Sequence, residues 1–364
     1  MIIEKAESII QKLPLVNNYY MKNAAKIKRE YCLFLHRFGY LKPISFVQWL
    51  ATYQCNFCCP FCEATAGKAG ENELTFDEVI TLIDDLAEMR VKRFIISGGE
   101  PLCRSDLIEI MRYGNKKKMI FGLVTNSYLV EELWDQLKQF KYFLYFTSID
   151  GLPEYHDIIR KKGSFKRVMK GIELFENIGV PSIMINTVVH PQNIEQLDDL
   201  LKFLKNSHNT LWRMAPLTKT GRAESKSKYF LEGHHLKYLV KFIKDNKDIM
   251  KIDLAESHTY LGCFSGQFVG KPFFCGAGLT RCSITPDGEV MGCHDVYDNS
   301  LSEGNIRQQA FSKIWKEGFS RFREKKRFHD SCKSCVHFNA CQGGCWTEMK
   351  KQNTCLKPLW EKEN

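Results

Sequence analysis

Six apolar, strand-like runs alternate with helical patterns along residues 45–217. The runs cover Phe46–Ala51, Arg93–Ser97, Ile120–Thr125, Phe143–Ile149, Ser182–Val189 and Leu211–Leu217. One intervening helix opens with a capping box at Thr75 and Glu78, and another opens near Ser164. Strands that alternate with helices in this way pair in parallel, so the sequence predicts an α/β fold built on a parallel sheet.

Length and composition leave room for a second folded unit. The chain has 364 residues, of which 44% are hydrophobic, enough for a core of about 200 residues and a further domain. No apolar run approaches the roughly 20 residues of a membrane span, and charged residues interrupt Met1–Tyr20, which argues against a secretory signal. We therefore predict a cytoplasmic protein whose 15 cysteines stay reduced and bind metal.

The formal net charge of +10 is spread along the chain, with local basic runs such as Lys116–Lys118. Such runs form solvated faces or attract an acidic partner. The runs lack interleaved aromatic residues and no recognition motif accompanies them, so the sequence gives no support for nucleic-acid binding.

A cysteine triplet directly follows the first predicted strand, as Cys55-x3-Cys59-x2-Cys62. Four-iron clusters normally take four thiolates, so three close cysteines leave one iron open to another ligand. Cys58 allows an alternative, a four-thiolate zinc site, although adjacent cysteines seldom point into one tetrahedron. If zinc is not bound, Cys58 is an extra cysteine that is expected to pack as a small apolar residue.

The triplet, with Phe61 before its last cysteine, resembles the radical S-adenosylmethionine (SAM) enzymes. In that family the open iron chelates the amino and carboxylate groups of SAM. An electron from the cluster then splits a carbon–sulfur bond and releases a 5′-deoxyadenosyl radical. The resemblance implies a partial (β/α)6 barrel, with the chemistry on loops that follow the strands.

Polar and glycine-rich segments after the later strands are similar to SAM-binding motifs of this family. Ser97-Gly98-Gly99-Glu100-Pro101 resembles the motif that contacts the SAM amino group, where glycines let the backbone approach a ligand. By resemblance, Ser148 and Asp150 lie near the ribose or the site floor, and Arg160 pairs with the SAM carboxylate. Alternatively, Asn126 and Asp150 only cap turns. The SAM site is thus predicted to contain Gly98, Gly99, Glu100, Pro101, Asn126, Ser148, Asp150 and Arg160.

The C-terminal cysteines are similar to the SPASM domain, the auxiliary-cluster module of radical SAM enzymes, over about residues 275–355. The resemblance implies two auxiliary [4Fe–4S] clusters beside the SAM-binding one, three in all. The first would be held by Cys275, Cys282, Cys293 and Cys345. The second would be held by Cys332, Cys335, Cys341 and Cys355. Two zinc ribbons are the alternative. Cys32, Cys103 and Cys263 receive no assignment.

His294 and Asp295 directly follow Cys293. Some relatives that oxidise a side chain have a carboxylate proton acceptor adjacent to this cysteine, whereas here the adjacent residue is histidine. This difference argues against a sulfatase-maturation role. Either residue is a candidate catalytic base, and support of the cluster is the alternative.

These expectations combine into a domain scheme and a function. The scheme has a helical extension at 1–42, a radical SAM barrel at 43–217, a bridging segment at 218–270 and a SPASM domain at 271–364. The resemblance implies an enzyme that abstracts hydrogen from a peptide or small protein and gives an oxidised or crosslinked product, with thioether or carbon–carbon bonds. A reductant such as flavodoxin or ferredoxin would supply electrons. The alternatives are modification of a tetrapyrrole or other small cofactor precursor, and a non-catalytic metal-binding scaffold.

Overall fold

The computed structural model describes residues 14–38, 44–205, 210–217, 219–255, 274–295, 298–324 and 330–345. The chain forms two compact units. The larger contains Pro43–Asp253 and Thr280–Phe319, and the smaller contains Met1–Lys42, Leu254–Leu279 and Ser320–Asn364. Residues 280–319 thus belong to the unit that contains the barrel strands, and the predicted domain bounds stay a prediction.

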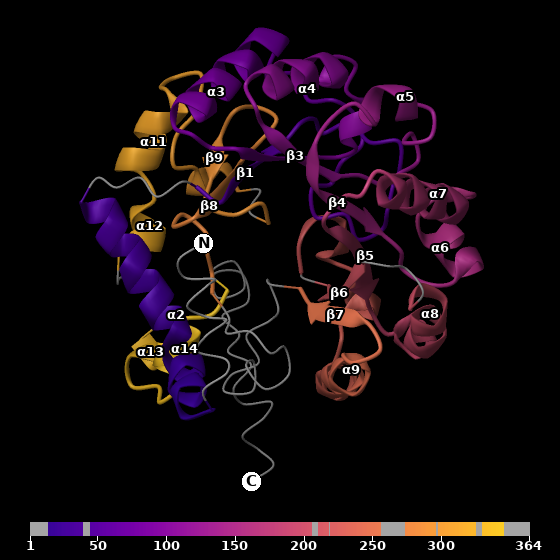
Figure 1. Ribbon diagram of the computed structural model, residues 1–364. Coiled ribbons are helices and arrows are strands. Elements are labelled where there is room, and N and C mark those ends of the chain that lie inside the picture. The colour runs from indigo at the N-terminus through magenta and orange to yellow at the C-terminus, as the bar shows by residue number, and fades with distance from the viewer. Residues whose placement is uncertain are drawn as a thin grey trace. The chain divides into compact units, whose positions relative to one another are not determined.

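A parallel sheet with helices along its outer side forms the larger unit (Figure 1). Its strand order is β7-β6-β5-β4-β3-β2-β1-β8-β9. The predicted strands are confirmed, with ends within a residue or two, as β1 (Phe46–Leu50), β2 (Arg93–Ser97), β3 (Ile120–Val124), β4 (Tyr142–Ser148), β5 (Ile183–Val189) and β6 (Thr210–Pro216). All five neighbouring pairs among them are parallel. Because β7 and β9 are separate edges, the barrel is open, as predicted.

The C-terminal third of the chain adds strands to this sheet. β8 (Arg281–Ile284) pairs in parallel with β1, and β9 (Val290–Met291) pairs antiparallel with β8. At the other edge lies β7 (Lys251–Leu254). β1, the strand that precedes the cysteine triplet, therefore lies between β2 and β8.

Two crossover helices of the larger unit begin where the sequence predicts. In α3 (Phe76–Glu88) the Thr75 hydroxyl accepts the Glu78 N–H at 3.3 Å, and the Glu78 carboxylate accepts the Thr75 N–H at 2.8 Å, which confirms the capping box. α7 (Ser164–Asn177) confirms the second predicted start. The other helices are α4 (Leu107–Lys116), α5 (Trp134–Leu137), α6 (Pro153–Ile159), α8 (Leu197–Leu204), α9 (Gly233–Asn246) and α11 (Phe311–Glu317), with 3-10 turns η1 (Pro101–Cys103), η2 (Ile194–Gln196), η3 (Gly221–Ala223), η4 (Ser227–Tyr229) and η7 (Asn299–Leu301).

Alternation along β5 and β6 separates the two faces of the sheet. One set of side chains is fully buried, as where Trp212 meets Phe242 of α9 with ring centroids 5.9 Å apart. The other set, which includes Val188 and Ala215, is half-buried. Because side chains alternate across a strand, the first set faces the helices and the second faces the inside of the barrel.

The smaller unit contains α2 (Pro14–Arg37), α12 (Ser320–Arg323), α13 (Asp330–Lys333) and α14 (Phe338–Cys341). Arg29 of α2 is buried and donates to the carbonyl oxygens of Phe322 and Arg323, each at 2.9 Å. These bonds satisfy carbonyls at the end of α12 that have no partner within the helix. Among the described residues, no helix is both long and apolar enough to span a bilayer.

Candidate active site

The cysteine triplet lies on the loop that leaves β1. Cys59 is buried, Cys55 and Cys62 are half-buried, and all three are free thiols. Burial raises the pKa of Cys55 to about 12, and the neighbouring charges of Glu100, Cys59 and Cys62 act in the same direction. Burial alone therefore disfavours the thiolate form that binds iron, and a bound cluster would supply the positive charge that stabilises it. Three thiols on one loop, none of them in a disulfide, fit the ligand set of a cluster.

Cys58 differs from its neighbours because its side chain is exposed, while the adjacent Cys59 is buried. The expectation that Cys58 packs as a small apolar residue is therefore wrong. Its side chain has no apolar surroundings to join, because the loop turns it toward solvent. The opposite orientation of the two adjacent thiols also disfavours a zinc site that uses both.

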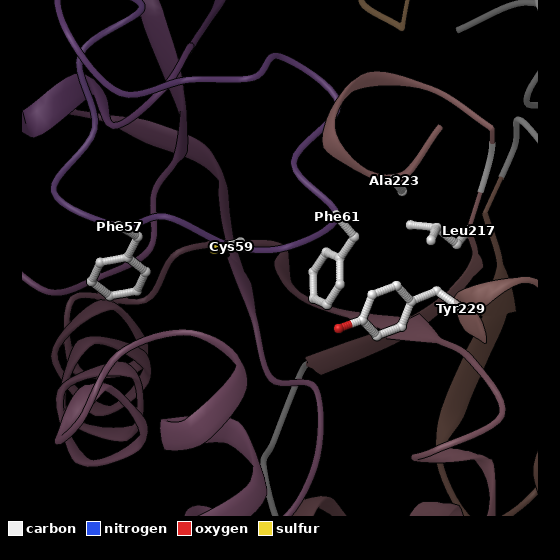
Figure 2. Close-up of a cluster of buried hydrophobic side chains, with 6 residues drawn as sticks. All are labelled: Phe57, Cys59, Phe61, Leu217, Ala223 and Tyr229. Atoms are coloured by element: carbon white, nitrogen blue, oxygen red, sulfur yellow. The ribbon is translucent and has the colours of Figure 1, made fainter. Parts of the chain in front are cut away.

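A hydrophobic cluster surrounds the buried cysteine (Figure 2). Phe61 packs edge-on against Tyr229, with ring centroids 6.1 Å apart and planes at 86°. Its members come from the cysteine loop and from the segment after β6: Phe57, Cys59, Phe61, Leu217, Ala223 and Tyr229. The cluster keeps water from one side of the triplet.

The predicted glycine motif packs directly against the chain that precedes Cys55. Gly99 N–H donates to Thr52 O at 2.7 Å, and Glu100 N–H donates to Gln54 O at 2.8 Å. A Cβ on Gly98 would lie 2.6 Å from Thr52 O, and one on Gly99 would overlap the carbonyl of Gln54. Only glycine allows this approach. Contact of the motif with the SAM amino group remains a prediction.

Glu100 is fully buried beneath the motif, where Pro101 begins η1. Its carboxylate accepts hydrogen bonds from the Thr125 hydroxyl at 2.7 Å, the Asn126 N–H at 2.7 Å and the Leu102 N–H at 3.1 Å. Burial raises the pKa of Glu100 to about 7, although these bonds oppose the shift. Glu100 thus ties the end of β3 to the glycine motif.

Asn126 joins the end of β3 to the cysteine loop. Its amide nitrogen donates to Asn56 Oδ1 at 2.7 Å, and its oxygen accepts the Tyr128 N–H at 3.0 Å. The second bond is the turn cap that the sequence offered as an alternative role. The first places Asn126 beside Cys55, at the predicted site.

Asp150 and Arg160 form a buried ion pair. Asp150 also accepts the Val188 N–H at 2.9 Å, and Arg160 Nη1 lies 3.7 Å from the Cys59 sulfur and over the Phe61 ring. Burial would raise the pKa of Asp150, but Arg160 outweighs it and the pKa is lowered. The guanidinium therefore brings positive charge to the buried thiol.

The segment Gly221-Arg222-Ala223 donates hydrogen bonds to carbonyl oxygens of the cysteine loop, a role that the sequence did not reveal. Arg222 N–H donates to Cys62 O at 3.1 Å, and its guanidinium donates to Cys59 O at 3.1 Å and to Ala66 O. Lys226 Nζ donates to Pro60 O at 3.1 Å. We call residues 221–226 the loop clamp. In the structure Gly221 has a φ of +56°, which favours glycine, but no local pattern of the sequence indicated these contacts.

A row of three polar side chains crosses the inside of the barrel. Ser148 of β4 is in register with Asn186 of β5, which is in register with Arg213 of β6. All three are half-buried, and within the part of the chain that the structure describes none makes a side-chain hydrogen bond or ion pair. Only Ser148 was predicted to belong to the site. Asn186 and Arg213 could have been found from the sequence, because each is a polar residue at an alternate position of an otherwise apolar strand.

The first predicted auxiliary ligands are divided between the units. Cys282 lies in β8 and Cys293 just after β9, so the β8–β9 hairpin brings both to one end. Next to Cys293, the His294 Nε2 atom lies 3.0 Å from Oδ1 of Asp295. The second carboxylate oxygen of Asp295, Oδ2, lies 3.7 Å from the Cys293 sulfur. Both predicted base candidates therefore contact the ligand region. Cys275 and Cys345 lie in the smaller unit.

Tight turns gather the remaining cysteines in the smaller unit. Cys335 N–H donates to Cys332 O, and Gly344 N–H donates to Cys341 O. Gln342, Gly343 and Gly344 all have positive φ, which reverses the chain between Cys341 and Cys345. Cys355 and Cys263 lie outside the described residues. The described thiols fit soft-metal ligation, and their predicted grouping into two clusters remains a prediction.

Comparisons with known proteins agree with this geometry. A model of the Radical SAM superfamily matches residues 49–204, and a model of the SPASM iron–sulfur cluster-binding domain matches residues 275–336. Mycofactocin maturase MftC of Mycolicibacterium smegmatis is 31% identical over 305 residues, which are 82% of this chain and 76% of that protein. An AdoMet-dependent heme synthase of Oleidesulfovibrio alaskensis is 28% identical, over 82% of this chain and 81% of that protein.

The fold is also that of a solved structure, Streptococcus suis SuiB bound to the precursor peptide SuiA. The TM-score is 0.70 at 18% identity, over 90% of this chain and 77% of that chain. The resemblance inferred from the cysteine patterns is confirmed. The chain belongs to the radical SAM enzymes that carry a SPASM iron–sulfur cluster-binding domain.

Proposed function

We propose that this enzyme modifies a peptide or small protein and leaves an oxidised or crosslinked product. The similarity to a mycofactocin maturase over 82% of the chain carries the proposal. The fold shared with SuiB, a protein solved with a precursor peptide, is compatible with it.

As a radical SAM enzyme, the protein uses SAM and [4Fe–4S] clusters. When bound, the cluster and SAM together supply a 5′-deoxyadenosyl radical that removes a hydrogen atom from the substrate. Cys55, Cys59 and Cys62 would hold the SAM-binding cluster. Arg160 supplies positive charge beside Cys59, and the Phe61 and Tyr229 rings exclude water.

The C-terminal cysteines would hold the auxiliary clusters, and these clusters would supply an acceptor for the electron released by substrate oxidation. Asp295 is suited to take a substrate proton in this step, because its carboxylate is half-buried beside Cys293 and His294. The initial electron would come from a flavodoxin or ferredoxin. A reducing cytoplasm suits the cysteines of the described residues, which form no disulfides with one another.

The first experiment is anaerobic reconstitution with SAM and a strong reductant. Wild type should release 5′-deoxyadenosine, and a Cys55/Cys59/Cys62→Ala variant should not, while it keeps its auxiliary iron. Short peptides encoded near the gene are then added as candidate substrates, and the mass of the true substrate should fall by the hydrogen lost in oxidation or crosslinking. Release of 5′-deoxyadenosine without any change to a peptide would reject that peptide as substrate.

The heme synthase similarity supports a second candidate, modification of a tetrapyrrole or another small precursor. The same reconstituted protein would then bind an added iron porphyrin with propionate side chains, seen as a shift of its visible absorption. A peptide enzyme should give no such shift. If neither SAM is cleaved nor either substrate bound, the metal-scaffold alternative is the better account.

A further inference from the structure

Arg213 is a charged side chain to which no role has been assigned. It lies on β6, in register with Asn186 of β5, and both are half-buried. Its burial pattern places it on the side of the strand opposite to Trp212 and Met214, whose side chains are fully buried. Arg213 therefore faces the inside of the barrel.

Neighbouring residues show that this face leads to the cysteine loop. Val188, two residues beyond Asn186, packs against the hydrophobic cluster that contains Cys59 and Phe61. Leu217, four residues beyond Arg213, belongs to the same cluster, and Figure 2 shows it close to Phe61 and Tyr229. Because side chains alternate along a strand, Arg213 lies on the same side, about two strand repeats of roughly 6.6 Å below Leu217.

The guanidinium of Arg213 has no acidic partner among the described residues. A half-buried charge without a partner is costly, so such a group is expected where a ligand completes the site. Arg160 differs, since it pairs with Asp150 and contacts Cys59. The two arginines thus lie at different positions, and only Arg160 has an acidic partner among the described residues.

We propose that Arg213 binds a carboxylate that enters the barrel, with the Asn186 amide beside it as a hydrogen-bond donor. A planar guanidinium matches a carboxylate with two parallel bonds. Arg213 is the one cation of the Ser148–Asn186–Arg213 row, which suits a single negative charge better than a phosphate. The inference deepens the proposed function, on which it rests, by assigning the substrate a carboxylate.

The carboxylate could belong to the substrate or to SAM. The substrate is the better source, because Arg160 already supplies positive charge next to Cys59. Arg213 is set back along β6 from the cluster loop, where a second molecule would lie. The experiment below separates the two sources.

The test is protection of Arg213 from phenylglyoxal, measured by mass spectrometry on the reconstituted wild-type protein. Arg112, which is exposed on α4, is the control in the same digest. With SAM present, glutarate at about nine times its Kd is expected to slow labelling of Arg213 about tenfold, because only about a tenth of the sites then stay unoccupied, and to leave Arg112 unchanged. Glutaramide, which lacks the charge, should not protect.

The outcomes are distinct. Protection by SAM but not by decarboxylated SAM, with no further effect of glutarate, supports the carboxylate site and assigns it to SAM. Equal protection by glutarate and glutaramide, no protection by any carboxylate, or an Arg213 that is never labelled overturns the proposal. The same samples are assayed for 5′-deoxyadenosine, so failure of the radical activity is recorded independently of carboxylate binding.

Discussion

Around Gly99 the chain leaves no space for a side chain. A Cβ there would lie 2.8 Å from Tyr53 O and overlap Gln54 O, both of which precede the first cluster cysteine. At Gly67, farther along the same loop, a Cβ would have one neighbour, Arg222 Nη2 at 3.8 Å. The two glycines therefore have different structural requirements, although both belong to the same site.

The substitution Gly99→Ala should push the cysteine loop away from the glycine motif. We expect a loss of about 1–3 kcal/mol in the free energy of unfolding, the usual cost of overpacking, and weaker retention of the SAM-binding cluster. Denaturant titration and iron analysis measure the two effects. Gly67→Ala is the control, and similar behaviour of both variants would disprove the steric argument.

Glu100 gives a prediction about pH. Its pKa is about 7 in the folded protein, above the usual 4.5, so the folded state holds a proton that the unfolded state releases between these values. Stability from this group is complete below the unfolded pKa and is lost as pH rises through 7. Relative to Glu100→Gln, wild type should lose about 2 kcal/mol between pH 5.5 and 8.

Chemical denaturation of both proteins across this pH range tests the sign. The exposed Glu224→Gln is a suitable control. A wild-type advantage that stays constant or grows with pH would mean that Glu100 is charged in the folded state. The carboxylate would then be held by its three hydrogen bonds rather than limited by burial.

Among the elements, the strands could be predicted from the sequence and the loop clamp could not. Apolar runs bounded by helical patterns located β1 to β6 to within a residue or two, because a buried parallel strand needs a continuous apolar run. Arg222, by contrast, contacts Cys59 O across 163 residues of chain. No local pattern of the sequence records such a partner.

The clamp contributes a testable stabilisation of the cysteine loop. Arg222→Gln removes the guanidinium bonds to Cys59 O and Ala66 O, each a charge-assisted contact. We expect a loss of about 3 kcal/mol and faster release of the SAM-binding cluster to a chelator. The nearby exposed Glu224→Gln should release iron at the wild-type rate. Equal release rates for all three proteins would show that the cysteines alone hold the loop.

At the scale of the whole molecule, the predicted cluster sites are divided between two units. The triplet, Cys282 and Cys293 belong to the larger unit, and Cys332, Cys335, Cys341 and Cys345 belong to the smaller. The assignment of these cysteines as cluster ligands came from their spacing and from the family resemblance, and it stays a prediction. Spacing could not show that β8 extends the barrel sheet, because strand pairing depends on distant partners.

Because their predicted ligands lie in different units, we expect that the auxiliary cluster held by Cys332 can be lost without loss of the SAM-binding cluster. Cys332→Ala should lower the iron content by one auxiliary cluster and abolish the finished product, while 5′-deoxyadenosine still forms, because the triplet is intact. Iron analysis with electron paramagnetic resonance measures the first effect and mass spectrometry the second. Cys32→Ala, which alters an unassigned thiol of α2, is the control. Loss of SAM cleavage in Cys332→Ala would contradict the separation.

The loop clamp also has a consequence for the order of events during synthesis. The ribosome delivers Cys55, Cys59 and Cys62 early, but Arg222 and Lys226, which fix the loop carbonyls, emerge some 163 residues later. β8, which borders the strand that carries the triplet, emerges later still. The pocket for the first cluster is therefore unfinished until β8 has been synthesised, and iron delivery to the triplet is expected to follow that point of elongation rather than the synthesis of the triplet itself.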